Sequence, residues 1–174
     1  SLSRGPMTAP NRLRSRLLPL IVTALSGALT AVAFPPHDLG PLAWVSLVPM
    51  FLCLYAARSA AQGALIGLVF GASFMGVLLQ SFTLWGLLPW IVLTLYQTLY
   101  FVAFGALAGP AMRATSPYTR PLAAAAAYTL LPSFARMAFH FAPFSAGDLA
   151  LSQHDHPPMI QMCSVCGQLG LTFL

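Results

Sequence analysis

The sequence contains no lysine and no glutamate. Only 6% of its 174 residues are charged: eight arginines and the three aspartates Asp38, Asp148 and Asp155. Hydrophobic residues make up 58% of the chain, and the mean hydropathy is +0.79. So little charge cannot cover the surface of a water-soluble domain, and several apolar runs are long enough to cross a bilayer. The composition therefore predicts an all-α fold, a polytopic bundle of transmembrane helices.

The positive charge of the chain does not predict a nucleic-acid partner. The net charge is +5 and the pI is about 9.6. A nucleic-acid site would gather the basic residues into one patch. Here the arginines are scattered between apolar runs, so they indicate membrane topology instead.

Six apolar runs follow a basic leader over residues 1–16, which we exclude from the fold. The first run is more typical of a retained helix than of a cleaved signal peptide, because five others follow it. The last run reaches Leu174 without a polar flank, so we expect a truncated span. The predicted spans are about 17–34, 41–57, 63–84, 90–112, 121–142 and 159–174.

Glycines at a spacing of four predict where helices pack closely. Gly63, Gly67 and Gly71 share one face of the third run, and Gly105 and Gly109 repeat the pattern in the fourth. Small residues at this spacing let two helix backbones approach each other. We interpret both stripes as packing surfaces.

The arginines also predict an orientation. With a cytoplasmic N-terminus, every arginine except Arg136 falls on the cytoplasmic side, as the positive-inside rule requires. The turn at 35–40 and the loop at 145–157 then lie outside. Any polar chemistry is expected on that outer side.

Arg136 is the first candidate for a functional residue. It lies inside the fifth run, one helical turn before His140, and a central arginine costs about 2.5–3.5 kcal/mol on insertion scales. We expect it to hold the outer part of the structure together or to meet a lipid headgroup, with Asp148 as its likeliest protein partner. The alternative is that Arg136 only snorkels to the headgroups and anchors the helix.

Two cysteines in the sixth run form a CxxC motif, Cys163 and Cys166. The two cysteines could form a redox pair, and together with His154 and His156 upstream they could supply four metal ligands. Inside an apolar helix, however, thiols act as small hydrophobic side chains, so we predict core packing, no metal site and no cofactor. No nucleophile with a base beside it is visible in the sequence.

An ordered set of short motifs resembles one membrane-enzyme family, the apolipoprotein N-acyltransferases, from Leu17 to Leu174. The motifs are Phe34, Pro35, Pro36, Asp38, Leu39, Gly40, Pro41, Leu42, Ala43 and Trp44, then Leu47, Val48 and Pro49, then Gly67, Phe70 and Gly71, then Arg136, Phe144, Gly147, Leu149, Ala150, Leu151, Ser152 and Gln153, and finally Gln161, Gly167, Gly170, Leu171 and Phe173. Trp44 and Gln153 become candidate binding or structural residues through this resemblance.

The resemblance implies an enzyme of the bacterial inner membrane. Such an enzyme moves an acyl chain from a phospholipid to the lipid-modified N-terminal cysteine of an apolipoprotein, through a thioester formed by a Glu-Lys-Cys triad in a nitrilase-like outer domain. The present chain has no glutamate and no lysine. We therefore expect it to be the membrane half without the catalytic domain, and to be inactive alone.

A rival hypothesis is a small multi-pass protein that binds or transports an anionic lipid or solute through Arg136 and His140. It needs no catalytic domain. The downstream reading frame separates the two hypotheses: a nitrilase-like segment with Glu, Lys and Cys supports the acyltransferase, and a stop near Leu174 supports the rival.

Overall fold

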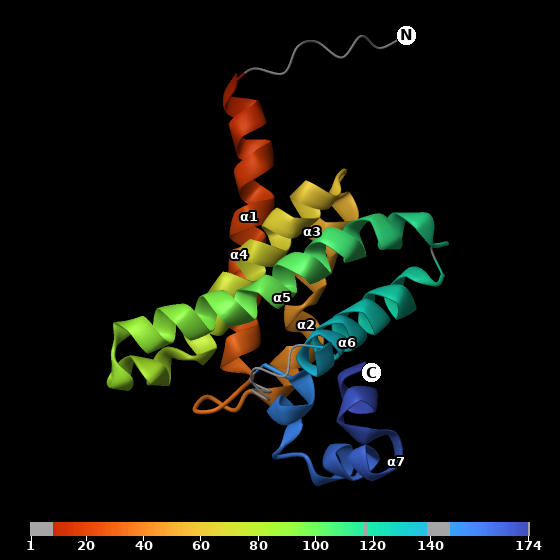
Figure 1. The fold of residues 1–174 in the computed structure, drawn as a ribbon. Helices are drawn as coiled ribbons and strands as arrows, with labels where there is room; N and C mark the ends of the chain where they lie inside the picture. The colour runs from red at the N-terminus through yellow and green to blue at the C-terminus, as the bar shows by residue number, and fades with distance from the viewer. Residues whose placement is uncertain (1–8, 117, 139–146, 174) are drawn as a thin grey trace.

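All regular structure in the described part of the chain is helical, as the composition predicts. A computed structural model describes residues 9–116, 118–138 and 147–173, with side chains from residue 17 onward apart from 131–138. The helices, in chain order, are α1 (Ala9–Val32), η1 (Gly40–Leu42), α2 (Ala43–Ser46), α3 (Val48–Ala56), α4 (Ala60–Leu78), η2 (Gln80–Trp85), α5 (Leu87–Ala114), α6 (Arg120–Ala138), η3 (Leu149–Gln153) and α7 (Pro157–Phe173) (Figure 1).

Two of these helices, α4 and α5, are long and apolar enough to cross a bilayer by length and composition. Two shorter apolar stretches, Leu17–Val32 and Gly40–Ala56, fall below that length. Six helical regions follow the predicted order of the six runs, but the prediction of six spans is not confirmed. The fifth predicted span continues past Ala138 into residues outside the described ranges.

The second predicted span is not one helix. The run 41–57 is divided into η1, α2 and α3, and the helix is interrupted at Leu47 between the last two. Pro49 has no backbone N–H, so it cannot donate the hydrogen bond that would join α3 to α2. Two hydrogen bonds from α1 hold Ser46, at the end of α2. Ser26 donates to the Ser46 carbonyl, and Thr30 donates to the Ser46 hydroxyl at 2.9 Å.

The third and sixth runs also differ from straight spans. The third ends as an α-helix at Leu78 and continues as η2 to Trp85, where Gly86 turns the chain with φ of 118°. The sixth bends at Gly167, whose φ of 70° and ψ of 175° are not helical. Glycine adopts both conformations without the steric cost that a Cβ would bring. The chain therefore changes direction at Gly86 and at Gly167, and the pattern of apolar residues does not predict either position.

The predicted glycine stripes form a close backbone contact between α4 and α5. A Cβ at Gly63 would overlap the carbonyl oxygen of Gly105, and a Cβ at Gly105 would overlap that of Gly63. A Cβ at Gly67 would meet the carbonyl oxygen of Phe101 in the same way. The prediction that these glycines are packing surfaces is confirmed, because the two backbones touch where the side chains are missing.

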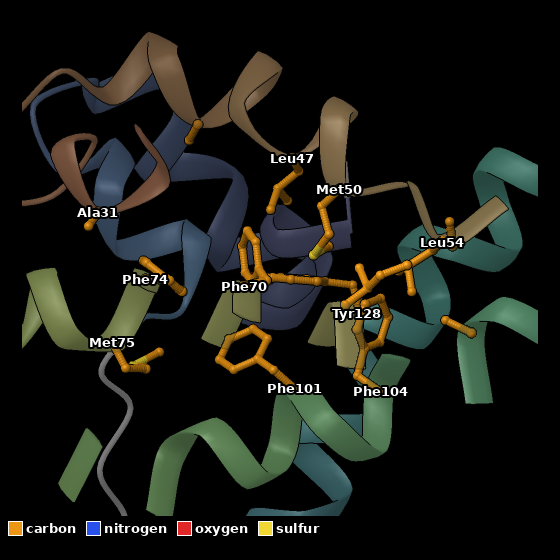
Figure 2. Close-up of a cluster of buried hydrophobic side chains, with 14 of the residues drawn as sticks. Ala31, Leu47, Met50, Leu54, Phe70, Phe74, Met75, Phe101, Phe104 and Tyr128 are labelled. Carbon is orange, nitrogen blue, oxygen red and sulfur yellow. The ribbon is translucent and has the colours of Figure 1, made fainter. Parts of the chain in front are cut away.

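Aromatic side chains fill the core beside this contact (Figure 2). Phe70 and Phe74 of α4 are fully buried, and the ring centroids of Phe70 and Phe101 are 5.3 Å apart. Tyr128 brings α6 into the same cluster, with its ring 5.6 Å from that of Phe104 in an edge-on arrangement. Tilted and edge-on pairs at these distances stabilise a core beyond the area that they bury. The core therefore joins α3, α4, α5 and α6.

The connections between helices fall at two opposite ends of the molecule (Figure 1). The start of α1, the α3–α4 connection and the α5–α6 connection lie at one end, and the α1–η1 turn, η2 and η3 lie at the other. Arg113 is in the last turn of α5 and Arg120 begins α6, so both belong to the first end. There Arg120 donates to the Tyr55 hydroxyl at 3.2 Å and lies 4.8 Å from its ring centroid.

Candidate functional site

A pocket of about 160 Å³ opens where α2 and α3 face α6, η3 and α7. Most of its wall is apolar, and Gln153, Thr172 and the Tyr128 ring add polar groups. An apolar pocket with few polar groups is typical of a site for an apolar ligand. Its lining residues are Ala43, Trp44, Leu47, Val48, Phe51, Ala125, Tyr128, Leu149, Gln153, Leu171, Thr172 and Phe173.

Gln153 fixes one side of the pocket to the first turn of the chain. Its side chain is 5% exposed, and its Nε2 donates to the carbonyl of Gly40 at 2.9 Å and to the Ser152 hydroxyl at 3.0 Å. A Cβ at Gly40 would lie 2.7 Å from the Ser152 carbonyl oxygen, so only glycine lets the two segments approach this closely. The buried amide therefore holds η3 against η1.

Asp148 lies just behind the pocket, at the start of η3. It is buried, and its carboxylate accepts hydrogen bonds from the Ala150 backbone N–H at 3.3 Å and from the Thr172 hydroxyl. Thr172 belongs to the last turn of α7 and lines the pocket. Asp148 thus connects η3 to the end of α7 through a residue of the pocket wall.

Trp44 forms part of the pocket on α2 and is half-exposed, at 49%. Phe51 of α3 and Tyr128 of α6 lie deeper, with ring centroids 6.5 Å apart. Among the described residues the Tyr128 hydroxyl is buried without a hydrogen-bond partner. Exposure of the pocket wall thus falls from the half-exposed Trp44 indole to the buried Tyr128 phenol.

Two of the five predicted site residues, Trp44 and Gln153, line this pocket, and a third, Asp148, reaches it through Thr172. Arg136 belongs to α6, but its side chain is not described, and His140 lies outside the described residues. The predicted pairing of Arg136 with Asp148 therefore stays a prediction.

Tyr128 and Thr172 are site residues that the sequence reasoning missed. Tyr128 had a signal, because residues 128, 132, 136 and 140 continue the spacing of four that places Arg136 and His140 on one face. Thr172 had none. It meets Asp148 only because the bend at Gly167 turns the end of α7 back toward α6 (Figure 1).

The cysteines of the CxxC motif take no part in the pocket. Both are free, Cys163 half-buried and Cys166 exposed. The prediction that they pack in the core was wrong for Cys166, because the first turns of α7 project away from the bundle and only the end of the helix packs, with Leu171 at 5% exposure (Figure 1). Cys53 does pack against the core.

The pocket suits binding more than covalent chemistry. No thiol, imidazole or carboxylate is among the side chains that line it in the described part of the chain. A nucleophile with a base within hydrogen-bond reach is what acyl transfer requires. The chemistry that this geometry supports is recognition of an apolar group.

The sequence model of the family described as "Apolipoprotein N-acyltransferase N-terminal domain" matches residues 26–174. The chain belongs to this family. It is 30% identical to the apolipoprotein N-acyltransferase of Geobacter metallireducens over 173 residues, covering 88% of this chain and 31% of that protein. It is 28% identical to the enzyme of the same name from Thermotoga maritima, covering 91% of this chain and 34% of that protein. The chain spans about a third of the length of these curated relatives.

Proposed function

We propose that this chain is the membrane domain of an apolipoprotein N-acyltransferase. The complete enzyme would take an acyl chain from a phospholipid and transfer it to the lipid-modified N-terminal cysteine of a lipoprotein. The match to the family over residues 26–174 carries the proposal. The coverage of about a third of two relatives of that name fits one domain of a larger enzyme.

The catalytic residues of that reaction belong, in this proposal, to a nitrilase-like domain outside the present chain. A glutamate would take the thiol proton, a lysine would stabilise the tetrahedral oxyanion, and a cysteine would carry the acyl group. This chain has neither glutamate nor lysine, and none of its three cysteines lines the pocket. The chain alone should therefore transfer no acyl group.

The part of this domain in the reaction would be to bind an apolar portion of a substrate. The pocket offers Leu47, Val48 and Phe51 for acyl chains, and it lies at the end of the molecule that carries the α1–η1 turn and η3. With the N-terminus in the cytoplasm, that end faces outward, toward the expected position of the catalytic domain. The arginine-bearing connections at the opposite end support this orientation.

A chimera tests the proposal. This chain would replace the aligned N-terminal third of the Geobacter metallireducens enzyme, and acylation of a diacylated lipopeptide would be measured in vesicles. Activity of the chimera with none from the isolated chain is the expected result. A matched chimera with its Trp44 changed to alanine should bind phospholipid more weakly.

A well-folded chimera without activity would contradict the proposed role, and so would turnover by the isolated chain. Circular dichroism and a single peak in gel filtration distinguish an inactive chimera from a misfolded one. The orientation has its own check: single cysteines in the 35–40 turn should react with an impermeant reagent from the periplasm, and cysteines at 115–119 should not.

A further inference from the structure

Asp38, His154 and Asp155 bring metal-ligating atoms together on the outer surface of the chain. Their ligand atoms all lie within 4.8 Å of one another. The His154 Nε2 is 3.6 Å from an Asp38 carboxylate oxygen and 3.3 Å from an Asp155 carboxylate oxygen. The single imidazole nitrogen therefore faces two carboxylates, one from the α1–η1 turn and one from the segment after η3.

The charge at this position lacks a fixed positive partner. Two of the three carboxylates of the chain meet here, and among the described residues neither forms an ion pair with an arginine. Two carboxylates sharing one site repel each other unless a cation lies between them. Among the described residues, the side chain recorded against both carboxylates is His154.

Buried contacts hold the two segments in place immediately beside the cluster. Gln153, the neighbour of His154, donates to the Gly40 carbonyl from a buried position, and Gly40 is two residues from Asp38. The backbone N–H of His156 donates to the Gln153 carbonyl at 3.0 Å. The ordering of the two segments is therefore already provided by the fold, so a ligand bound here need not supply it.

A second imidazole lies over the same turn. The Cε1 of His156 is 3.6 Å from the position that a Cβ on Gly40 would take. Three of the four histidines of the chain, His37, His154 and His156, lie in these two short segments. Histidine nitrogens are therefore concentrated in the two segments that carry the carboxylates.

We propose that Asp38, His154 and Asp155 bind a divalent transition-metal ion such as Zn²⁺. One imidazole nitrogen and two carboxylate oxygens form a donor set that zinc accepts, and three protein ligands leave a position for water. The ion would join the α1–η1 turn to the segment before α7, next to Gln153 of the pocket wall in the sequence. The sequence reasoning predicted no metal site because it combined His154 and His156 with the cysteines of α7 and left Asp38 aside.

Zinc titration of the chain, purified in detergent without a polyhistidine tag and stripped with chelator, tests this site. Competition with a chromophoric zinc chelator should give one Zn²⁺ per chain. His154→Ala should weaken zinc binding at least about tenfold. Loss of a residue that only hydrogen-bonds to a metal ligand typically lowers the metal affinity about 10- to 100-fold, and loss of the ligand itself should cost no less. His37→Ala, in the same turn but outside the cluster, is the matched control and should bind as the parent does.

A second measurement follows folding. At a free Zn²⁺ concentration of a hundred times Kd, the melting temperature of the parent chain should rise by roughly 5–10 °C. The rise should disappear in Asp38→Asn with Asp155→Asn, although this variant should keep the helical circular dichroism of the parent. Neither result depends on acyltransferase activity, so the site and the proposed function can fail separately.

Three outcomes would overturn the site. One is the absence of stoichiometric zinc binding, in which case the cluster is only a set of polar contacts at the surface. Another is equal zinc affinity in the parent and His154→Ala, which would move binding elsewhere. The last is an equal loss in His37→Ala, which would refute the assigned ligands.

Discussion

The α4–α5 contact and the corner formed by α6, η3 and α7 are built on opposite plans. In the first, glycines let backbone meet backbone, and phenylalanines fill the remaining space. In the second, a pocket stays open, and buried polar side chains join segments that are distant in the sequence. The first region depends mainly on shape, with one side-chain hydrogen bond from Trp90 to the Gly76 carbonyl at 3.1 Å, and the second depends on directional bonds.

The difference shows where this fold tolerates change. A close backbone contact leaves no space for an additional side-chain atom, because any added atom must push the two helices apart. A corner held by a few hydrogen bonds loses one bond at a time, and each loss has a moderate cost. The rigid pair is therefore suited to be the frame and the polar corner to be the site.

The largest effect is expected at Gly67. Gly67→Leu should lower the free energy of unfolding by roughly 3 kcal/mol or more, because its side chain would occupy the place of the Phe101 carbonyl. The measurement is chemical or thermal unfolding in detergent. Gly76→Ala is the control on the same helix: its Cβ would meet nothing nearer than 3.9 Å, and alanine favours a helix over glycine, so this variant should lose no stability. Equal losses in both variants would mean that α4 and α5 are not in contact at Gly67.

Arg136→Leu comes next, and it tests whether the polar corner extends to α6. If Arg136 pairs with Asp148, its removal leaves a buried carboxylate without its charge partner and should cost about 3 kcal/mol in unfolding. If it only snorkels, the change should be close to neutral or stabilising in lipid. A double-mutant cycle with Asp148→Asn decides between the two. Additive effects in that cycle would remove Arg136 from the site.

A smaller loss is expected for Gln153→Leu, about 1–2 kcal/mol in unfolding, because the Gly40 carbonyl would stay buried without its donor. Gln168→Leu, at an exposed position of α7, is the control and should change stability little. Protection of the Trp44 indole from an acrylamide quencher should also fall in Gln153→Leu as the pocket wall loosens. Unchanged stability would show that η3 does not depend on this bond.

The smallest effect is expected at Cys166. Cys166→Ser should alter stability by less than about 0.5 kcal/mol, since the side chain is exposed and away from the core. A maleimide should modify Cys166 faster than Cys53, which packs against the core. Slow modification of Cys166 would mean that its surface is covered.

The sequence predicts the apolar helices of this fold much better than their bends. Hydrophobic runs locate the helices because apolar length is a property of composition. Glycine spacing correctly identifies a packing face on α4 and one on α5, but not that the two faces pack against each other. Leu47 and Gly167 are different. Whether a helix is interrupted or bends at such a residue depends on what the next segment packs against. An apolar run in the sequence does not indicate those contacts.

The site could be predicted in part for the same reason. Trp44, Gln153 and Asp148 were found through motif resemblance and through the scarcity of charge in an apolar chain. Thr172 was not, because its role needs the turned end of α7. Asp38 was seen as part of a motif, but its approach to His154 depends on the bond between Gln153 and Gly40, which joins positions 113 residues apart.

That bond also sets an order of assembly. A chain made from its N-terminus can close the α4–α5 hairpin as soon as Ala114 has been synthesised, because both partners are then present. The wall formed by Trp44 and Phe51 must wait more than a hundred residues for Gln153 and Thr172 to arrive. Until then this wall of the pocket has no partner, and η3 and α7 are the last of the pocket-lining segments to be made.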